Sequence, residues 1–268
     1  MTKIAVALTI AGSDSGGGAG IQADLRAFAF NGVHGTCAIT CITAQNTLGV
    51  TRVDAVPVSG VIAQIEAVVT DITVAALKTG MLLNQEIIKA VAAQINLHGL
   101  SNLVVDPVMV SRTGAQLIDN NAIDSLREYL IPHATVLTPN RYEAQLLSGL
   151  EIDTLEQMKK AAEKIYKLGS KAVIVKGGAM KDGLHGVDVW FDGNKHEIVQ
   201  TETIETPHTH GTGCTLSAAI AANLALGEEP FSAFVQAKHY VTQALKNALP
   251  LGSGTGPVGI YTGRLKIG

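Results

Sequence analysis

Short β-branched apolar segments alternate with amphipathic segments along most of the chain, and this alternation restricts its fold more than any other feature. The apolar segments have the length and composition of buried strands, and the amphipathic segments have the 3.6-residue repeat of helices. Such an alternation predicts a mostly parallel sheet with helices on both faces. The predicted strands are 4–10, 37–44, 76–80, 102–108, 135–140, 171–178 and an antiparallel pair within 187–199. The predicted helices are 19–32, 58–72, 84–99, 120–130 and 154–169.

No linker, low-complexity stretch or internal repeat interrupts this pattern. We therefore expect residues 1–268 to form a single α/β domain, a three-layer α/β/α sandwich around a mostly parallel sheet. The composition agrees, because 47% of the residues are hydrophobic while only 4% are aromatic, which suits helices layered on a buried sheet better than an all-β sandwich.

Charge and cysteine content narrow the possible partners and the compartment. The formal net charge is −3 and no run of lysines or arginines occurs, so we expect no nucleic-acid partner. No apolar run approaches the ~18 residues of a membrane span, so we expect no membrane association. The three cysteines, Cys37, Cys41 and Cys214, cannot form a closed set of disulfides, which predicts a reducing, cytoplasmic location.

The first glycine-rich turn, GSDSGGGAGIQADL at 12–25, follows the first predicted strand. It matches neither a P-loop, which would continue with Lys and Ser/Thr, nor the dinucleotide-binding pattern. Its glycines either form a simple turn or allow a small ligand to approach the backbone closely. Asp14 and Asp24 supply polar groups beside it.

Three later strand ends carry polar residues. Asp106 follows an apolar strand and either faces a ligand or caps the turn before Pro107. Asn140 and Glu143, three residues apart, either offer oxygen ligands to Mg²⁺ or form a capping box at a helix start. Lys176 ends a very apolar strand, where it either neutralises phosphate charge or extends its amino group to solvent.

The segment THGTGC, 209–214, leads into an alanine-rich helical stretch that ends near Gly227. Glycines at 211 and 213 free the backbone to direct consecutive N–H groups at one point, and the helix dipole there favours an anion. We expect this turn to hold a transferring phosphoryl group and to lower the thiol pKa of Cys214. The alternative is a small buried cysteine. We interpret His208 and His210 as loop-packing residues rather than a metal pair.

Together these stretches resemble the bacterial hydroxymethylpyrimidine/phosphomethylpyrimidine kinases of thiamine biosynthesis, within the ribokinase-like superfamily. The resemblance covers the whole chain, and the order of its motifs is specific although each motif alone is not. The motifs are LTIAGSDSGGGAGIQADL near the start, TAQNTLGV (43–50), KTGM (78–81), DPVM (106–109), TPNRYEA (138–144), VKGG (175–178), HTHGTGCT (208–215) and GTGPV (254–258).

This resemblance implies a homodimeric kinase that uses ATP and Mg²⁺ to phosphorylate a small pyrimidine alcohol and then its monophosphate. By the same resemblance, the substrate-binding residues are Gln45, Gly12, Asp24, Met81 and Val108. The ATP-binding residues are Lys176, Asn140 and Arg112, the last in a mobile, anion-closing loop, and the metal ligands are Asp106 and Glu143. The catalytic group consists of Gly211, Thr212, Gly213 and Cys214.

Cys214 stands where many superfamily relatives have a catalytic aspartate. A fixed carboxylate would repel a phosphate monoester, whereas a thiol can be neutral, so we hypothesise that the cysteine allows one site to perform both phosphorylations. Two residues depart from the usual pattern of relatives: Ala179 replaces a histidine, and Arg112 replaces a lysine.

Three other functions compete with this one. A pyridoxine or pyridoxal kinase shares the fold and the GTGC-type turn, and an enzyme accepting both substrates is also conceivable; Gln45 favours the pyrimidine. A hydrolase with Cys214 as nucleophile leaves Lys176 and the Asn140–Glu143 pair unexplained. A nucleotide-binding module without catalysis leaves Lys176 and Cys214 unexplained.

Overall fold

A nine-stranded sheet runs through the described part of the protein, which in this computed structural model comprises residues 4–109, 118–181 and 183–259. The strand order is β3-β2-β1-β4-β5-β6-β7-β8-β9. Strands β1, β2 and β4 to β7 pair in parallel, while β3, β8 and β9 pair antiparallel at the two edges. The strands are β1 (Val6–Asp14), β2 (His34–Asn46), β3 (Gly49–Ala55), β4 (Ala76–Thr79), β5 (Leu103–Val105), β6 (Val136–Leu137), β7 (Val173–Val175), β8 (Val187–Phe191) and β9 (His196–Gln200).

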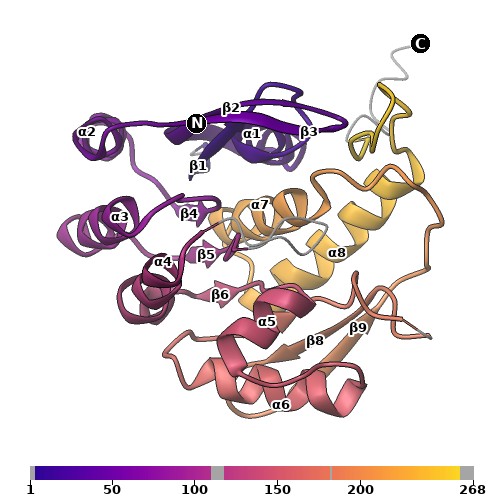
Figure 1. Cartoon of the computed structure of the whole chain (residues 1–268). Coiled ribbons are helices and arrows are strands. Elements are labelled where there is room, and N and C mark those ends of the chain that lie inside the picture. The colour runs from indigo at the N-terminus through magenta and orange to yellow at the C-terminus, as the bar shows by residue number, and fades with distance from the viewer. Residues whose placement is uncertain (1–3, 110–117, 182, 260–268) are drawn as a thin grey trace.

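Helices cover both faces of the sheet, as Figure 1 shows. One apolar core contains residues of α2 (Val58–Val69), α3 (Gln85–Leu97), α4 (Asn120–Ser125), α5 (Arg141–Ser148) and α6 (Leu155–Tyr166). The other contains residues of α1 (Gly20–Phe30), α7 (Thr212–Ala225) and α8 (Pro230–Lys246). The prediction of a three-layer α/β/α sandwich is confirmed.

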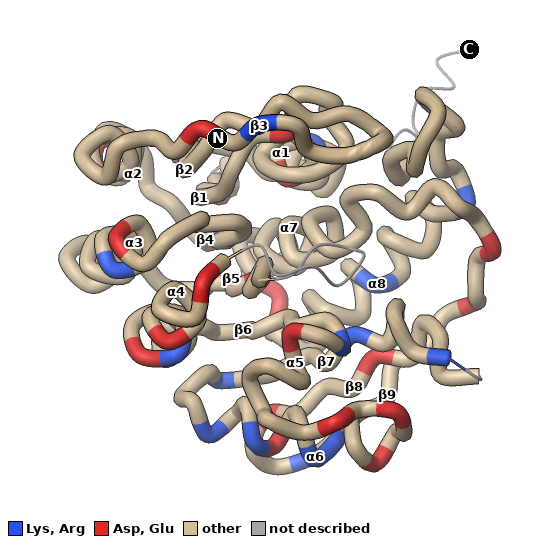
Figure 2. The backbone as a smooth tube through the Cα atoms, in the orientation of Figure 1, with Lys and Arg blue, Asp and Glu red and all other residues tan. Residues whose placement is uncertain are grey.

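The strands divide their side chains between these two cores. In β5, Leu103 and Val105 enter the first core and Val104 enters the second. This alternation follows from the two-residue period of a strand, and because both faces are covered, every position of β5 must be apolar. Charged residues lie mostly outside the sheet, where Figure 2 shows both signs interspersed on helices such as α3 and α6.

The structure corrects several predicted bounds. Strands β5 and β6 are shorter than predicted, because prolines at 107 and 139 lack the N–H that would continue the ladder. The helix predicted over 120–130 is α-helical only to Ser125 and continues as a π-helix, Leu126–Leu130. Strand β3 was not predicted, because all of its residues are exposed and it has no apolar face to reveal it. The bounds of α8 were likewise not predicted.

Within the described ranges, none of the helices has both the length and the apolar composition to cross a bilayer.

Candidate active site

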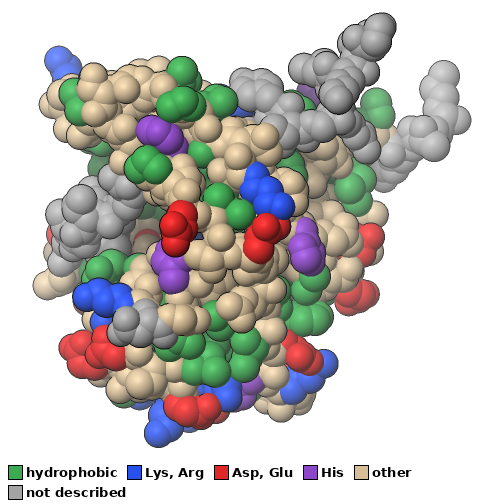
Figure 3. Space-filling view, turned by 90° about the vertical axis from the view of Figure 1, so that its right-hand side faces the viewer, with side chains coloured by type: hydrophobic (Ala, Val, Ile, Leu, Met, Phe, Trp, Pro, Cys, Tyr) green, Lys and Arg blue, Asp and Glu red, His purple; other side chains and the backbone are tan. Residues whose placement is uncertain are grey.

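The polar residues singled out in the sequence gather where the parallel strands end. Parallel strands all end at one edge of a sheet, and ligands of such folds bind there. Figure 3 views the right-hand side of Figure 1, where exposed acidic, basic and histidine side chains lie on the surface above these buried strand ends. Helix α7 packs against β1, β4 and β5, so its N-terminus lies near the middle of the edge at which the parallel strands end.

Asp106 and Lys176 form an ion pair at this edge. Lys176 Nζ lies 3.1 Å from Asp106 Oδ1, and the hydroxyl of Ser217 donates to Asp106 Oδ2 at 3.2 Å. Burial alone would raise the pKa of Asp106, but the nearby ammonium groups of Lys176 and Lys78 hold it below its ordinary value. The pair therefore stays ionised, with Asp106 only 3% exposed.

Asn140 and Glu143 form the capping box that was one of their two interpretations. Asn140 Oδ1 accepts from the Glu143 amide at 3.0 Å, and Glu143 Oε2 accepts from the Asn140 amide at 2.8 Å. Glu143 is 2% exposed, and burial, together with the charge of Asp106, raises its pKa to about 8. This carboxyl is therefore stabilised by any cation that binds beside it.

Helix α7 begins without a side-chain cap, at Gly211. The first N–H groups of a helix have no intrahelical partner, so this N-terminus can bind an anion. Gly211 has φ 82°, and a Cβ there would lie 1.9 Å from the Gly18 carbonyl oxygen, so only glycine fits. A Cβ on Gly213 would lie 3.4 Å from Lys176 Nζ, which places the Asp106–Lys176 pair directly beside the helix start.

The expected lowering of the Cys214 thiol pKa is wrong. Burial raises this pKa to about 11, although the positive charge of Lys78 opposes it. The helix dipole acts on the thiolate, but the loss of hydration outweighs it at this half-buried position. The thiol is therefore neutral at physiological pH.

Lys78 is a buried residue of this region that the sequence analysis did not assign. It lies within β4, and its Nζ donates to Asp24 Oδ1 at 3.0 Å and Oδ2 at 2.8 Å. The hydroxyl of Thr9 donates to the same carboxylate at 2.6 Å. Both side chains of the ion pair are 0% exposed, so Asp24 lies beneath the site rather than open to it. A lysine inside the otherwise apolar ALKT strand was the signal that could have revealed it.

The first glycine-rich turn is organised by Asp14. Its carboxylate accepts backbone N–H groups from Gly16 at 2.9 Å, Gly18 at 3.0 Å and Ala19 at 2.8 Å. His210 Nε2 lies 2.9 Å from Asp14 Oδ2. Burial alone would raise the pKa of Asp14, but the hydrogen bonds from His210 and Ala19 hold it below its ordinary value. The turn is thus joined to the segment that leads into α7.

The residues assigned to substrate lie on neighbouring elements at the same edge. Gln45 comes from β2 and is half-buried. Gly12, near the end of β1, is packed so closely that a Cβ would lie 2.6 Å from Cys41 Sγ and 3.0 Å from Met81 Cε. Val108 follows β5 and is half-buried. The Gln45 amide contacts the ring of His210, the residue before Gly211, and therefore lies beside the start of α7.

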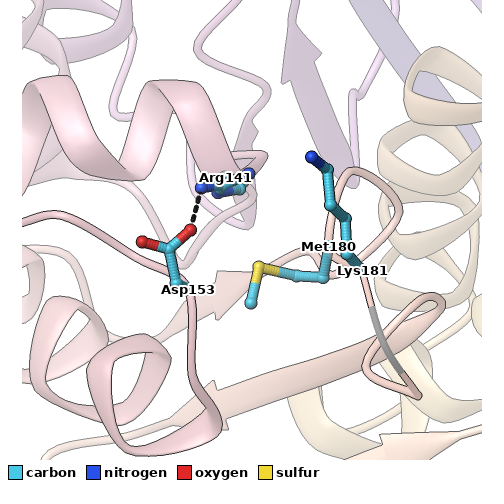
Figure 4. A pocket seen from close by; sticks show the side chains of 4 residues that line it. All are labelled: Arg141, Asp153, Met180 and Lys181. Carbon is cyan, nitrogen blue, oxygen red and sulfur yellow. Dashed lines mark hydrogen bonds and ion pairs between the residues drawn. The ribbon is translucent and has the colours of Figure 1, made fainter.

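Arg112 lies outside the described residues. A small pocket near the start of α5 is lined by Arg141, Asp153, Met180 and Lys181 (Figure 4). The guanidinium of Arg141 pairs with Asp153, so it does not serve the Asp106–Lys176 edge.

Comparison with known sequences shows the family to which the chain belongs. A sequence model of the family described as phosphomethylpyrimidine kinase matches residues 14–259. The chain belongs to the phosphomethylpyrimidine kinase family. The hydroxymethylpyrimidine/phosphomethylpyrimidine kinase of Synechococcus elongatus is 62% identical to it over 258 residues, which are 96% of this chain and 98% of the relative.

Solved structures agree with the fold of the phosphomethylpyrimidine kinase family. The phosphomethylpyrimidine kinase of Clostridium difficile matches with a TM-score of 0.81 at 42% identity, covering 91% of this chain and all of that chain. An ADP complex of Bacillus subtilis pyridoxal kinase matches with a TM-score of 0.90 at 42% identity, covering 96% and 97%. The predicted family, ribokinase-like fold and kinase activity are confirmed, against the hydrolase and the non-catalytic module.

Proposed function

We propose that the protein transfers the terminal phosphoryl group of ATP to the hydroxyl of 4-amino-5-hydroxymethyl-2-methylpyrimidine and then phosphorylates the resulting monophosphate, within thiamine biosynthesis. The observation that carries this proposal is that one helix start, at Gly211, lies beside both Lys176 and the Gln45 amide, which contacts His210, the residue before Gly211. Cationic and N–H groups for a phosphate thus lie on the same sheet edge as an amide suited to a heterocycle.

The phosphate end of the site is built for charge stabilisation. In phosphoryl transfer the protein mainly positions the reactants and stabilises the charge on the transferred oxygens. Lys176 supplies a cation, and the N–H groups of Gly213 and Cys214 in the first turn of α7 supply donors, whereas the Thr212 N–H donates to the Thr209 carbonyl oxygen. With the alcohol acceptor, the hydroxyl oxygen forms the new P–O bond and releases its proton to water, while the bond to the ADP oxygen breaks. The ADP and AMP-PCP complexes of similar kinases support ATP as the phosphoryl donor.

The donor set at this edge fits Mg²⁺. Asp106 and Glu143 are adjacent carboxyl groups, and the raised pKa of Glu143 reflects a buried oxygen pair that a cation would stabilise in its charged form. Among the residues that the structure describes, no group of three or more His, Cys, Asp or Glu side chains could hold a metal ion. Two carboxyl groups are enough for Mg²⁺, since it keeps waters and substrate phosphates as its other ligands. When bound, the ion neutralises and orients phosphate oxygens.

The neutral thiol of Cys214 explains how one site accepts both substrates. A carboxylate at this position would repel the incoming monophosphate, whereas a thiol with a pKa of about 11 carries no charge near neutral pH. The hydroxyl of the first substrate and the monophosphate of the second can therefore occupy the same place beside α7.

Phosphorylation of pyridoxal or pyridoxine is the second candidate activity. Its support is the similarity to the Bacillus subtilis and Staphylococcus aureus pyridoxal kinases, with TM-scores of 0.90 for their ADP complexes. Gln45 favours the pyrimidine, because a side-chain amide pairs best with a ring that carries adjacent donor and acceptor groups.

One assay tests these activities. The purified protein is incubated with ATP, Mg²⁺ and either the aminopyrimidine alcohol or pyridoxal, and the masses of the products are measured by mass spectrometry. We expect two added phosphates on the pyrimidine. A single phosphate on pyridoxal with none on the pyrimidine would favour the second activity, and no phosphate on either would contradict both.

We further propose that the chain acts as a single domain, in the cytoplasm, as a homodimer formed through the β2–β3 extension. Every residue of β3 is exposed, and apolar side chains there include Val50 at 51% and Val53 at 43% exposure. Leu48, in the connecting turn, is 73% exposed. A second copy that covers this apolar surface removes it from water. Sedimentation of the wild-type protein and Val53→Glu would show a dimer and a shift towards monomer, respectively.

A further inference from the structure

His210 contacts the substrate-facing amide of Gln45, although the sequence analysis interpreted it only as a loop-packing residue. Gln45 Nε2 lies 3.3 Å from His210 Nε2, and Gln45 Oε1 lies 3.2 Å from Thr43 Oγ1. The oxygen and nitrogen of a carboxamide exchange places when the group turns by 180°. The two neighbours therefore decide which atom is which.

His210 requires an oxygen. Its Nε2 lies 2.9 Å from Asp14 Oδ2, and a carboxylate oxygen can only accept, so Nε2 must carry a proton. A protonated Nε2 has no lone pair with which to accept an amide N–H, so the Gln45 atom that faces it is Oε1, which shares the Nε2 proton with Asp14 in a three-centre hydrogen bond.

Thr43 independently requires the nitrogen. Its hydroxyl has a single proton, and this proton is donated to the Ser13 carbonyl oxygen at 2.7 Å. The longer contact to Gln45 must then be one in which Thr43 accepts, and only the amide nitrogen can donate. Both neighbours thus select the same orientation.

We propose that His210 is a positioning residue that holds the Gln45 carboxamide with its oxygen towards His210 and its nitrogen towards Thr43. The inference rests on the proposed function, because it concerns how the acceptor substrate is selected. A carboxamide has two lone pairs and two N–H protons, and His210 and Thr43 use one of each. One lone pair and one N–H remain side by side for the substrate.

This remaining pair specifies the chemistry of the ligand. It complements a ring nitrogen next to an exocyclic amino group, which is the pattern of an aminopyrimidine. The fixed orientation places the amino group on the His210 side and the ring nitrogen on the Thr43 side. A flipped amide would place donor opposite donor and acceptor opposite acceptor. The hydrogen bonds of the Gln45 amide with His210 and Thr43, which we call the amide lock, therefore exclude the reversed pairing.

The amide lock is rigid because His210 is held from several sides. Asp14 is fixed by three backbone N–H groups of the first turn, and the backbone of His210 pairs with the segment at Gly256 and Pro257. A Cβ on Gly18 would lie 2.3 Å from His210 Cδ2, so the absence of a side chain there leaves room for the ring.

The test compares two alcohols, the aminopyrimidine alcohol and the same compound without its ring amino group. In the wild-type protein we expect a higher kcat/KM for the first. His210→Phe keeps a flat ring but removes Nε2, and we expect the ratio of the two kcat/KM values to fall by about tenfold, with the KM for ATP little changed. Adding His210→Phe to Gln45→Ala should lower the ratio no further than Gln45→Ala alone, because both act through one contact.

His208 provides the matched control. Its Nδ1 accepts the Gly256 amide at 3.0 Å, so it anchors the same segment without touching Gln45. His208→Phe should leave the ratio at the wild-type value. If His210→Phe also leaves the ratio unchanged, or lowers both kcat/KM values equally, the inference is overturned.

A second variant tests the hydrogen bond between Thr43 and the Gln45 amide. Thr43→Val has nearly the same shape but cannot accept a hydrogen bond, and we expect it to lower the ratio by several-fold. If His210→Phe fails to fold, a wild-type ratio in Thr43→Val overturns the inference. Failure of the proposed function is a separate result, since the wild-type protein would then phosphorylate neither alcohol.

Discussion

Two lysine–aspartate pairs lie near Cys214, and they differ in how completely their hydrogen-bonding groups are used. Lys78 donates to both oxygens of Asp24, Thr9 also donates to that carboxylate, and both charged side chains are 0% exposed. Lys176 makes one contact of 3.1 Å with Asp106, and the two side chains are 13% and 4% exposed. We call these the closed pair and the open pair.

The difference indicates that the two pairs have different roles. The closed pair has its charges balanced internally, so it supports the sheet beneath the site and has little to offer a ligand. The open pair lies beside the uncapped start of α7, where we propose that a phosphate of the substrate becomes the second partner of its lysine. Cys214 is electrostatically coupled to both lysines, and its chemistry depends on this arrangement.

Disrupting the closed pair should have the largest of the predicted effects, and this effect should be a loss of stability. Lys78→Met leaves the Asp24 charge buried without its partner, and we expect the free energy of unfolding to fall by about 3–5 kcal/mol in urea titrations. The double variant Lys78→Met with Asp24→Leu should recover most of this loss, because a buried ion pair can be replaced by apolar side chains. A loss below about 1 kcal/mol in the single variant would contradict the closed assignment.

Breaking the open pair should instead reduce catalysis. Lys176→Gln removes a cation from the transferred phosphoryl group, and we expect kcat to fall by about 10²–10³-fold. The urea midpoint should change much less than in Lys78→Met. Lys171→Gln, at an exposed lysine just before the same strand, is the control and should leave kcat near wild type. An equal loss of stability in both pair variants would remove the distinction between the pairs.

The reactivity of Cys214 measures the balance between burial and the two lysines. Burial raises its thiol pKa from an ordinary value of 9.0 to about 11, so less thiolate is present at any pH below 11. At pH 8 we expect alkylation by iodoacetamide to be on the order of 10²-fold slower than in the urea-unfolded protein. Mass spectrometry of the peptide that carries Cys214 gives the rate. Equal rates in folded and unfolded protein would show that burial does not dominate.

The position of Asp106 and Lys176 at neighbouring strand ends was predicted from sequence, although their ion pair was not, and the closed pair was not predicted at all. Asp106 and Lys176 each follow an apolar strand, and parallel topology alone brings strand ends together. Lys78 lies within a strand, and its partner Asp24 lies 54 residues away, on a helix. Nothing in the local pattern of either residue indicates the other.

Two other features escaped sequence analysis for physical reasons. The thiol pKa of Cys214 depends on a competition between the helix dipole and burial, and burial is set by tertiary packing. The interaction of His210 with Gln45 joins residues separated by 165 positions, so no spacing rule reveals it. Family resemblance placed Gln45 in the substrate site, but only the three-dimensional contacts indicate what orients its amide.

The smallest predicted effect tests why a thiol stands between the two pairs. Cys214→Asp would place a third carboxylate near Asp24 and Asp106, where it would repel the monophosphate substrate but could still accept a proton from the hydroxymethyl substrate. We expect formation of the diphosphate to fall by about tenfold more than formation of the monophosphate, measured by product quantification with each acceptor. Cys214→Ser, which is neutral like the thiol, should preserve the balance between the two steps. If Cys214→Asp makes the diphosphate as well as it makes the monophosphate, the neutrality of residue 214 does not explain the acceptance of two substrates.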